Sequence, residues 1–130
     1  MSTMFALTAF NQPLNSWNTS YVVDMGNMFG GTTMFNQPIG SWDTSKVVVI
    51  SSIFQGAQKF NQPIGSWDTS RVMFMNQAFL YSKAFNQPLN SWNTSKVITM
   101  QYMFRESIFN QDLSSWTVNP NVTTCDMFKA

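Results

Sequence analysis

The chain has 130 residues, of which 44% are hydrophobic and 10% charged, and its seven Lys and Arg against six Asp and Glu leave a net charge of +1. One excess positive charge provides no basic stripe for a nucleic acid. The absence of histidine and the single cysteine exclude His-based acid–base catalysis, most transition-metal sites and an internal disulfide.

The start of the chain, Met1 to Phe5, lacks the basic region and apolar core of a signal peptide. No uninterrupted apolar run approaches the roughly 20 residues that a membrane helix needs. We therefore expect a soluble chain with no membrane span, signal peptide or anchor.

One string of residues, Phe35 to Ser45, recurs along the whole chain. The other copies are residues 10–20, 60–70 and 85–95, with a degenerate copy from Phe109 to Trp116. Their starts are 25, 25, 25 and 24 residues apart, a spacing typical of tandem-repeat architectures. We predict one tandem-repeat domain over residues 1–130, with a partial unit at 1–9 and repeats that start near residues 10, 35, 60, 85 and 109.

The array begins and ends inside a unit. Met4-Phe5 matches the tail of a repeat, and Met127-Phe128 repeats that tail at the other end. Neither end carries an obvious polar capping unit, which stacked repeats usually need to cover an open apolar edge. Two explanations stay open: a fragment of a longer array, or a protein whose ends meet other copies.

Aligned repeats place like residues in columns, which predicts that successive copies lie directly on one another. Stacked equivalent residues would lie about 4.8 Å apart, and stacked aromatic rings would add about 0.5–1.5 kcal/mol per pair. The apolar columns are Phe10/35/60/85/109, Leu14/Ile39/Ile64/Leu89/Leu113, Trp17/42/67/92/116, Val22/47/72/97, Met25/Ile50/Met75/Met100 and Phe29/54/79/104/128.

Each repeat has two halves with different patterns. In the first, residues 37–42 are the better candidate for a stacked parallel strand, with Pro38 at its start because proline lacks an N–H. In the second, apolar residues at i, i+3 and i+7 from Val47 to Phe54 indicate a short helix capped by Thr44 or Ser45, although the β-branched run Val47–Ile50 suits a strand. We favour the helical turn. The predicted fold class is α/β, a leucine-rich-repeat-like solenoid of about five 25-residue coils, with an all-β solenoid as the alternative.

Polar columns accompany the core. We interpret Asn11/36/61/86/110 as an amide ladder that satisfies turn backbone and neighbouring amides, because buried polar groups must be paired. We interpret Thr19-Ser20, Thr44-Ser45, Thr69-Ser70 and Thr94-Ser95 as capping and turn hydrogen bonds, with an ice-binding hydroxyl surface as the rival. Cys125 falls in the Met25 column, so we expect a buried free thiol.

Asp43 and Asp68 stand in adjacent repeats. Two carboxylates roughly 5 Å apart would suit a calcium ion, but Lys46 and Arg71, three residues on, favour a solvated surface pair of little energetic weight. No base, nucleophile or pocket signal supports a catalytic pair. We expect no catalytic residues, no metal site and no cofactor.

One group of apolar residues departs from the core pattern, because it lies between the Val and Met columns. Facing inward, these residues would be extra core, helped by the adaptability of methionine; facing outward, they would form a patch that marks an interaction surface. We favour the core, yet this patch is the contact site that we predict for a recognition role. Its residues are Val48, Val49, Met73, Phe74 and Ile98.

The chain resembles the roughly 25-residue repeats of bacterial surface proteins and mycoplasma-type surface lipoproteins, which are related to BspA-like leucine-rich repeats. The resemblance rests on Met-Phe (Met28-Phe29, Met103-Phe104), the string Phe85 to Ser95, and Val97-x-x-Met100, and it covers essentially the whole chain. It implies a curved leucine-rich-repeat-like solenoid with a role in adhesion or protein recognition, extracellular or at the cell surface. It implies no catalytic residues.

Three hypotheses for function follow. The first is a non-enzymatic repeat protein that binds a protein partner or a cell surface. The second is a structural protein whose copies join end to end into filaments. The third is ice binding through the Thr-Ser column.

Overall fold

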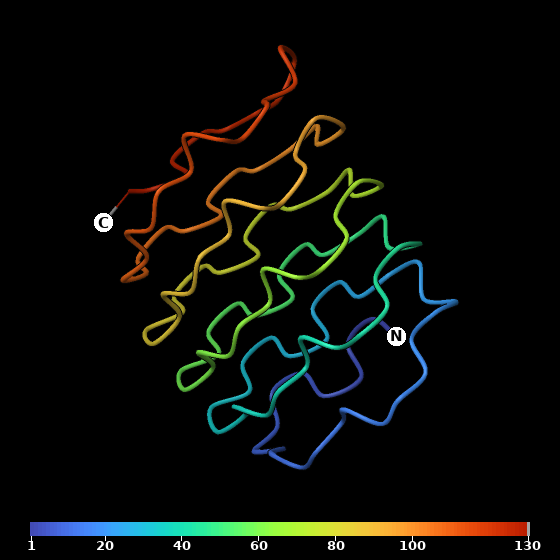
Figure 1. The fold of residues 1–130 in the computed structure, drawn as a ribbon. Coiled ribbons are helices and arrows are strands. Elements are labelled where there is room, and N and C mark those ends of the chain that lie inside the picture. The colour runs from blue at the N-terminus through green and yellow to red at the C-terminus, as the bar shows by residue number, and fades with distance from the viewer. Residues whose placement is uncertain (130) are drawn as a thin grey trace.

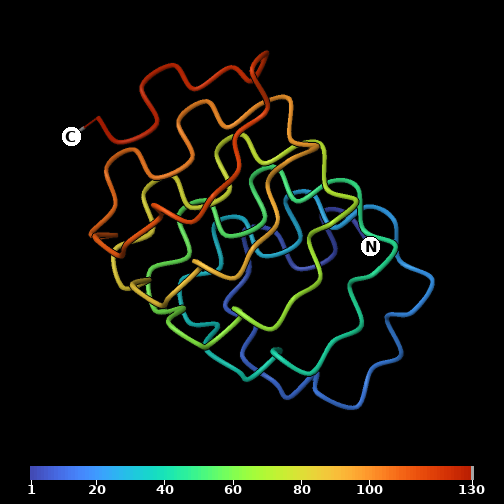
Figure 2. The same ribbon diagram turned by 45° about the horizontal axis from the view of Figure 1, so that its top comes forward.

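The computed structural model describes residues 1–129. The chain winds in successive circuits that lie on one another, from the blue N-terminal circuits at one end of the stack to the red C-terminal circuits at the other (Figure 1). The tilted view in Figure 2 shows the same order of circuits. Each repeat of about 25 residues makes one circuit, which we call a layer.

The predicted fold class is wrong. Residues 1–129 contain no helix and no extended strand, and their only β-pairing is four isolated parallel bridges. These bridges link one residue per layer, in the order Asp24, Val49, Phe74, Thr99 and Thr123. The chain is therefore neither an α/β leucine-rich-repeat-like solenoid nor an all-β solenoid with clear strands, but a stack of layers made of turns.

Consecutive β-turns replace the expected helix in the second half of each repeat. In one layer, an N–H bonds the carbonyl three residues earlier in three successive turns: Ile53 to Ile50, Gln55 to Ser52 and Ala57 to Phe54, at 3.2, 3.0 and 3.0 Å. Ser52 is the third residue of the first turn and Gly56 is the third residue of the last. Their φ angles are +57° and +67°, as the third residue of a type II turn requires. A helix cannot contain such residues, because they reverse the sense of the backbone.

The same segment bonds the next layer through its alternate residues. The N–H groups of Ile50, Ser52, Phe54 and Gly56 donate to the carbonyl oxygens of Phe74, Asn76, Ala78 and Leu80, at 2.7–3.0 Å. From Ser52 to Ala57 each N–H is thus satisfied either within the turns or between layers, as backbone donors must be when buried. The turns also bury Ile50, Ile53, Phe54 and Ala57. This spacing resembles that of a helix, which explains why the sequence pattern indicated one.

Side chains join the layers in the first half of each repeat, where we had expected a strand. Asn61 Oδ1 accepts hydrogen bonds from Asn86 N at 3.0 Å and from Gln87 Nε2 at 3.1 Å, and Gln87 Nε2 also donates to Asn61 O. Asn61 N in turn donates to Asn36 Oδ1 at 3.0 Å. The amide ladder is therefore confirmed. It takes the place of a backbone ladder, which the prolines cannot complete because they have no N–H.

Aromatic columns form the centre of the stack, as predicted. Trp42, Trp67 and Trp92 stack with centroids 6.4 and 6.3 Å apart and ring planes 4° apart. Phe60 and Phe85 stack at 5.9 Å, and Phe54 lies 4.0 Å from Phe60 within one layer. One continuous buried core runs from Leu14 to Phe109. A single layer has no neighbour on which to bury these rings, so the core exists only in the stack.

The first and last layers leave parts of these columns uncovered. Trp17 is 38% exposed, whereas the three central tryptophans are at most 4% exposed, and Phe128 is 58% exposed. Cys125 is exposed rather than buried. The expectation for this thiol is wrong because its column is covered only where the described residues provide layers on both sides.

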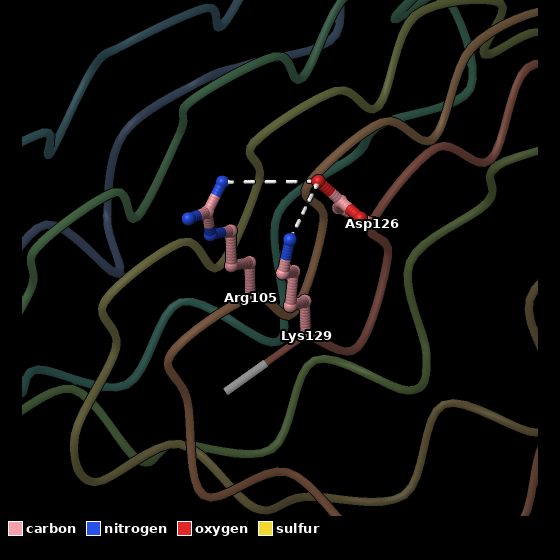
Figure 3. A network of polar contacts seen from close by, with 3 residues as sticks. All are labelled: Arg105, Asp126 and Lys129. Atoms are coloured by element: carbon pink, nitrogen blue, oxygen red, sulfur yellow. Dashed lines mark ion pairs between the residues drawn. The ribbon is translucent and has the colours of Figure 1, made fainter.

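A small polar network lies at the C-terminal end of the described chain (Figure 3). The Asp126 carboxylate lies 4.0 Å from Arg105 Nη1 of the preceding layer and 3.8 Å from Lys129 Nζ of its own turn. The Arg105 guanidinium also lies 5.5 Å from the Tyr102 ring centroid. Because Arg105 and Asp126 are each about one-third exposed, their ion pair contributes at most about 1 kcal/mol.

Candidate functional site

The five predicted contact residues lie together on the outside of the stack. Met73 and Ile98 are 38% and 37% exposed, and Val48, Val49 and Phe74 are half-buried. None of them belongs to the buried core, so the inward orientation that we favoured from the sequence is wrong. The parallel bridges bring Val49 next to Phe74, which joins the residues of neighbouring layers into one surface.

Three of these residues belong to a longer column of outward-facing side chains, which we call the apolar row. The row consists of Val23, Val48, Met73 and Ile98, one from each of four layers. Val23 is 52% exposed and was not among the predicted contact residues. The residue just before each member is buried or packs against the core, as Val47 and Val22 do.

A column of cations, which the sequence analysis did not recognise, lies two residues before the apolar row. This basic row consists of Lys46, Arg71 and Lys96, all exposed. Tyr21 precedes them in the first layer, and Lys46 Nζ lies 4.2 Å from its ring centroid. Lys46 lies in the turn that the hydrogen bond from Val47 N to Thr44 O closes, and one residue separates it from Val48, so the basic row borders the apolar row along the chain. The recurrent Thr-Ser-Lys/Arg-Val order is the signal that would have revealed it.

The expected neutralisation of these cations by Asp43 and Asp68 does not occur as ion pairs. Within residues 1–129, neither carboxylate lies within ion-pair distance of a cation. Each instead accepts a hydrogen bond from the backbone N–H two residues on, Ser45 to Asp43 at 3.0 Å and Ser70 to Asp68 at 2.9 Å. The hydrogen bonds from Ser45 and Ser70 lower the pKa of both carboxyls, with a smaller contribution from the nearby cations.

The threonine column faces the core. Thr19, Thr44, Thr69 and Thr94 are at most 3% exposed, and Thr44 Oγ1 donates to Asp68 O at 3.1 Å. The interpretation as capping and turn hydrogen bonds is wrong for these threonines, because their hydroxyls bond backbone carbonyls of the next layer. Because this column presents no hydroxyl surface to water, the ice-binding hypothesis loses the observation that supported it.

A shallow cavity opens elsewhere on the surface, and the sequence analysis did not find it. It has a volume of about 350 Å³, at the lower end of the range of small-molecule sites. Its lining residues are Leu7, Asn27, Gly30, Gly31, Gln55, Gly56 and Tyr81. We call it the glycine notch.

The described part of the chain holds no group of three or more Cys, Asp or Glu side chains that would bind a metal ion. Residues 1–129 form no helix that is long and apolar enough to cross a membrane.

One protein family matches the chain over its whole length. The family model described as "Mycoplasma protein of unknown function, DUF285" matches twice, over residues 1–79 and 62–130. No curated protein and no solved structure matches. The overlapping matches agree with the repeat structure of the chain and with its resemblance to mycoplasma-type repeats.

Proposed function

Because this chain belongs to the DUF285 family of Mycoplasma proteins, and because its surface carries paired apolar and basic rows, we propose that it is a non-catalytic module that recognises other proteins at the cell surface. The contact site is the apolar row with Val49 and Phe74, flanked by the basic row. The partner is a protein surface on which acidic side chains border an apolar strip.

The observation that carries this proposal is the pairing of an exposed apolar row with cations that have no ion-pair partner among residues 1–129. Apolar side chains exposed side by side mark interaction surfaces more than scattered ones do. Lys46, Arg71 and Lys96 repeat layer after layer, so their charges add along one edge. Complementary charge steers the encounter and sets specificity, and salt screens it.

The resemblance to surface lipoproteins and BspA-like repeats supports an extracellular location. This resemblance lies in the repeat sequence and not in the fold. The location is testable on intact cells of the source organism. Protease added outside should degrade the protein before any cytoplasmic marker. Survival of the protein until the cells are lysed would contradict a surface location.

A charge-insertion experiment tests the contact site. Ile98→Asp should lower binding of the fluorescently labelled chain to intact animal cells at least tenfold, because a carboxylate replaces apolar contact and repels an acidic partner. Ile108→Asp is the matched control, since Ile108 is also exposed, at 52%, but lies outside both rows. Equal binding by the two variants would overturn the proposed site.

The basic row has its own control. Replacing Lys46, Arg71 and Lys96 with Ser should weaken binding and reduce its dependence on salt, whereas Lys59→Ser should do neither. Protease treatment of the cells beforehand should abolish binding, because the partner is a protein. Binding that survives this treatment would point to a lipid or glycan instead.

End-to-end self-assembly is a second candidate, favoured by the exposed Trp17 and Phe128 on the end layers. Non-closing contacts between opposite ends generate filaments. Light scattering over a concentration series should then show open-ended growth, and Phe128→Asp should stop it. A constant monomer mass at all concentrations would contradict this candidate.

A further inference from the structure

The glycine notch lies in a column of residues with left-handed backbone. In four successive layers this position is held by Leu7, Gly31, Gly56 and Tyr81, with φ of +58°, +70°, +67° and +58°. The backbone does not demand glycine here, because Leu7 and Tyr81 adopt the same conformation. The two glycines therefore remove side chains from the middle of a column, and their absence opens the notch.

The walls of the notch are the side chains that remain. Leu7 and Tyr81 stand at its two ends, 87% and 44% exposed. A Cβ on Gly31 would lie 2.6 Å from Leu7 Cδ2, and a Cβ on Gly56 would find nothing nearer than the Gly31 Cα at 3.8 Å. The floor of the notch is thus the backbone of Gly31 and Gly56. Of the two walls, only the Leu7 side chain lies close to this floor.

Two neutral amides border this floor. The Asn27 side chain folds over Gly30, where an added Cβ would overlap it. Gln55 occupies the position equivalent to Gly30 in the next layer and also lines the notch. The nearby Gln58 Nε2 donates to the carbonyls of Gly56 and Tyr81, whereas within residues 1–129 the Asn27 and Gln55 amides bond no protein group. Both amides are free to donate and accept outward. No charged residue lines the notch.

We propose that the glycine notch binds a neutral pyranose ring of a carbohydrate. The Tyr81 ring and Leu7 match the apolar C–H face of a sugar, and the Asn27 and Gln55 amides match its hydroxyls, each amide offering donors and an acceptor. A purely apolar ligand would leave both amides unpaired, which costs affinity. An anionic ligand would meet no cation among the lining residues, and the neighbouring Lys83 Nζ lies 5.9 Å from the Tyr81 ring centroid. This site is separate from the apolar and basic rows, so it stands or falls independently of the protein-recognition proposal.

NMR titration of the full chain tests the assignment. The probes are the methyl pyranosides of glucose, galactose and mannose, together with N-acetylglucosamine; the apolar control is cyclohexane-methanol and the anionic control is N-acetylneuraminic acid. At least one neutral sugar should shift the backbone amide signals of Gly31, Gly56 and Tyr81, with a Kd of about 1 mM for a single ring. No shift by any neutral sugar at about ten times that concentration, or a comparable shift by either control, would overturn the proposal.

Two variants and one matched control localise the site. Tyr81→Ser should weaken binding about tenfold through the loss of stacking, and Gly56→Asn should abolish it, since asparagine tolerates positive φ and fills the notch. Tyr102→Ser should leave binding unchanged: Tyr102 also has positive φ, +56°, and a neighbouring cation, but lies outside the notch. If one variant fails to fold, the other decides. Unchanged sugar affinity in a folded Tyr81→Ser or Gly56→Asn variant would refute the site.

Discussion

The indole N–H of Trp67 donates a hydrogen bond to the carbonyl oxygen of Ile39, one layer earlier, at 3.0 Å. The same bond recurs for Trp42, Trp92 and Trp116. Each tryptophan therefore fastens its layer to the preceding one and also stacks in the aromatic column. Loss of one such side chain should affect two interfaces at once.

Trp67→Ala should lower the free energy of unfolding by about 3–5 kcal/mol, because it empties a large aromatic site and removes one of the two hydrogen bonds that the Ile39 carbonyl accepts. The measurement is urea unfolding, read from the midpoint at constant slope. Trp17→Ala is the control in the end layer, where the side chain is 38% exposed, and should cost only about 1 kcal/mol. Equal losses of unfolding free energy in the two variants would show that stacking on both sides does not stabilise a central layer more than an end layer.

Asn61→Ala should cost about 1–3 kcal/mol, because the Asn86 N–H and Gln87 Nε2 lose their shared acceptor. Asn61→Asp should retain most of the stability near neutral pH, since a carboxylate accepts the same two bonds. Both variants are compared by thermal and urea unfolding. A neutral Asn61→Ala substitution would contradict the role of the amide ladder in joining layers.

Thr44→Val should cost about 1–2 kcal/mol, because Thr44 is 3% exposed and its hydroxyl bonds the Asp68 carbonyl. Thr44→Ser keeps the hydroxyl and serves as the control, with a smaller loss from the missing methyl group. Urea unfolding separates the two. If Thr44→Val were as stable as the unchanged chain, the column would have no structural role.

Acid should destabilise the fold through Asp43, Asp68 and Asp112. The hydrogen bonds from Ser45, Ser70 and Ser114 place the pKa of each carboxyl below its ordinary 3.8 in the folded chain. A depressed pKa contributes stability that is complete above the unfolded value and is lost as the pH falls through the folded value. The loss should therefore begin near pH 4 and continue below it, as followed by urea unfolding across that range.

Repeats of the same chain provide the control for this acid dependence. Asn18 and Asn93 occupy the column of Asp43 and Asp68 and bond Ser20 and Ser95 in the same way, without titrating. Replacing Asp43, Asp68 and Asp112 with Asn should flatten the pH dependence and preserve the fold. An unchanged acid transition in that variant would assign the loss to other carboxyls.

Gly56→Ala should cost about 1–2 kcal/mol, the usual penalty of a Cβ in left-handed backbone. The added Cβ meets no close neighbour, so the cost measures conformation alone. Glu106→Gly, at the equivalent position with φ of +56°, should leave stability unchanged or raise it. A cost-free Gly56→Ala would show that the turns adapt their backbone.

Sequence reasoning found what a repeat reveals directly: the register of the layers, the aromatic columns and the amide ladder. It failed for Val47 to Phe54, where consecutive β-turns bury apolar residues at the same spacing as a helix does. It also chose the wrong side for Met73 and Ile98, because an apolar residue between two core columns can face inward or outward, and the sequence pattern does not distinguish the two. The notch around Gly31 and Gly56 gave no signal, since it consists of side chains that are missing.

The sequence by itself determined that like residues lie above like residues, because a 25-residue period repeated in register leaves equivalent side chains no better partners than one another. Only the tertiary structure decided how the backbone travels between them. Each N–H can bond within a turn or across to the next layer, and the choice depends on contacts with a neighbouring layer that no single repeat contains.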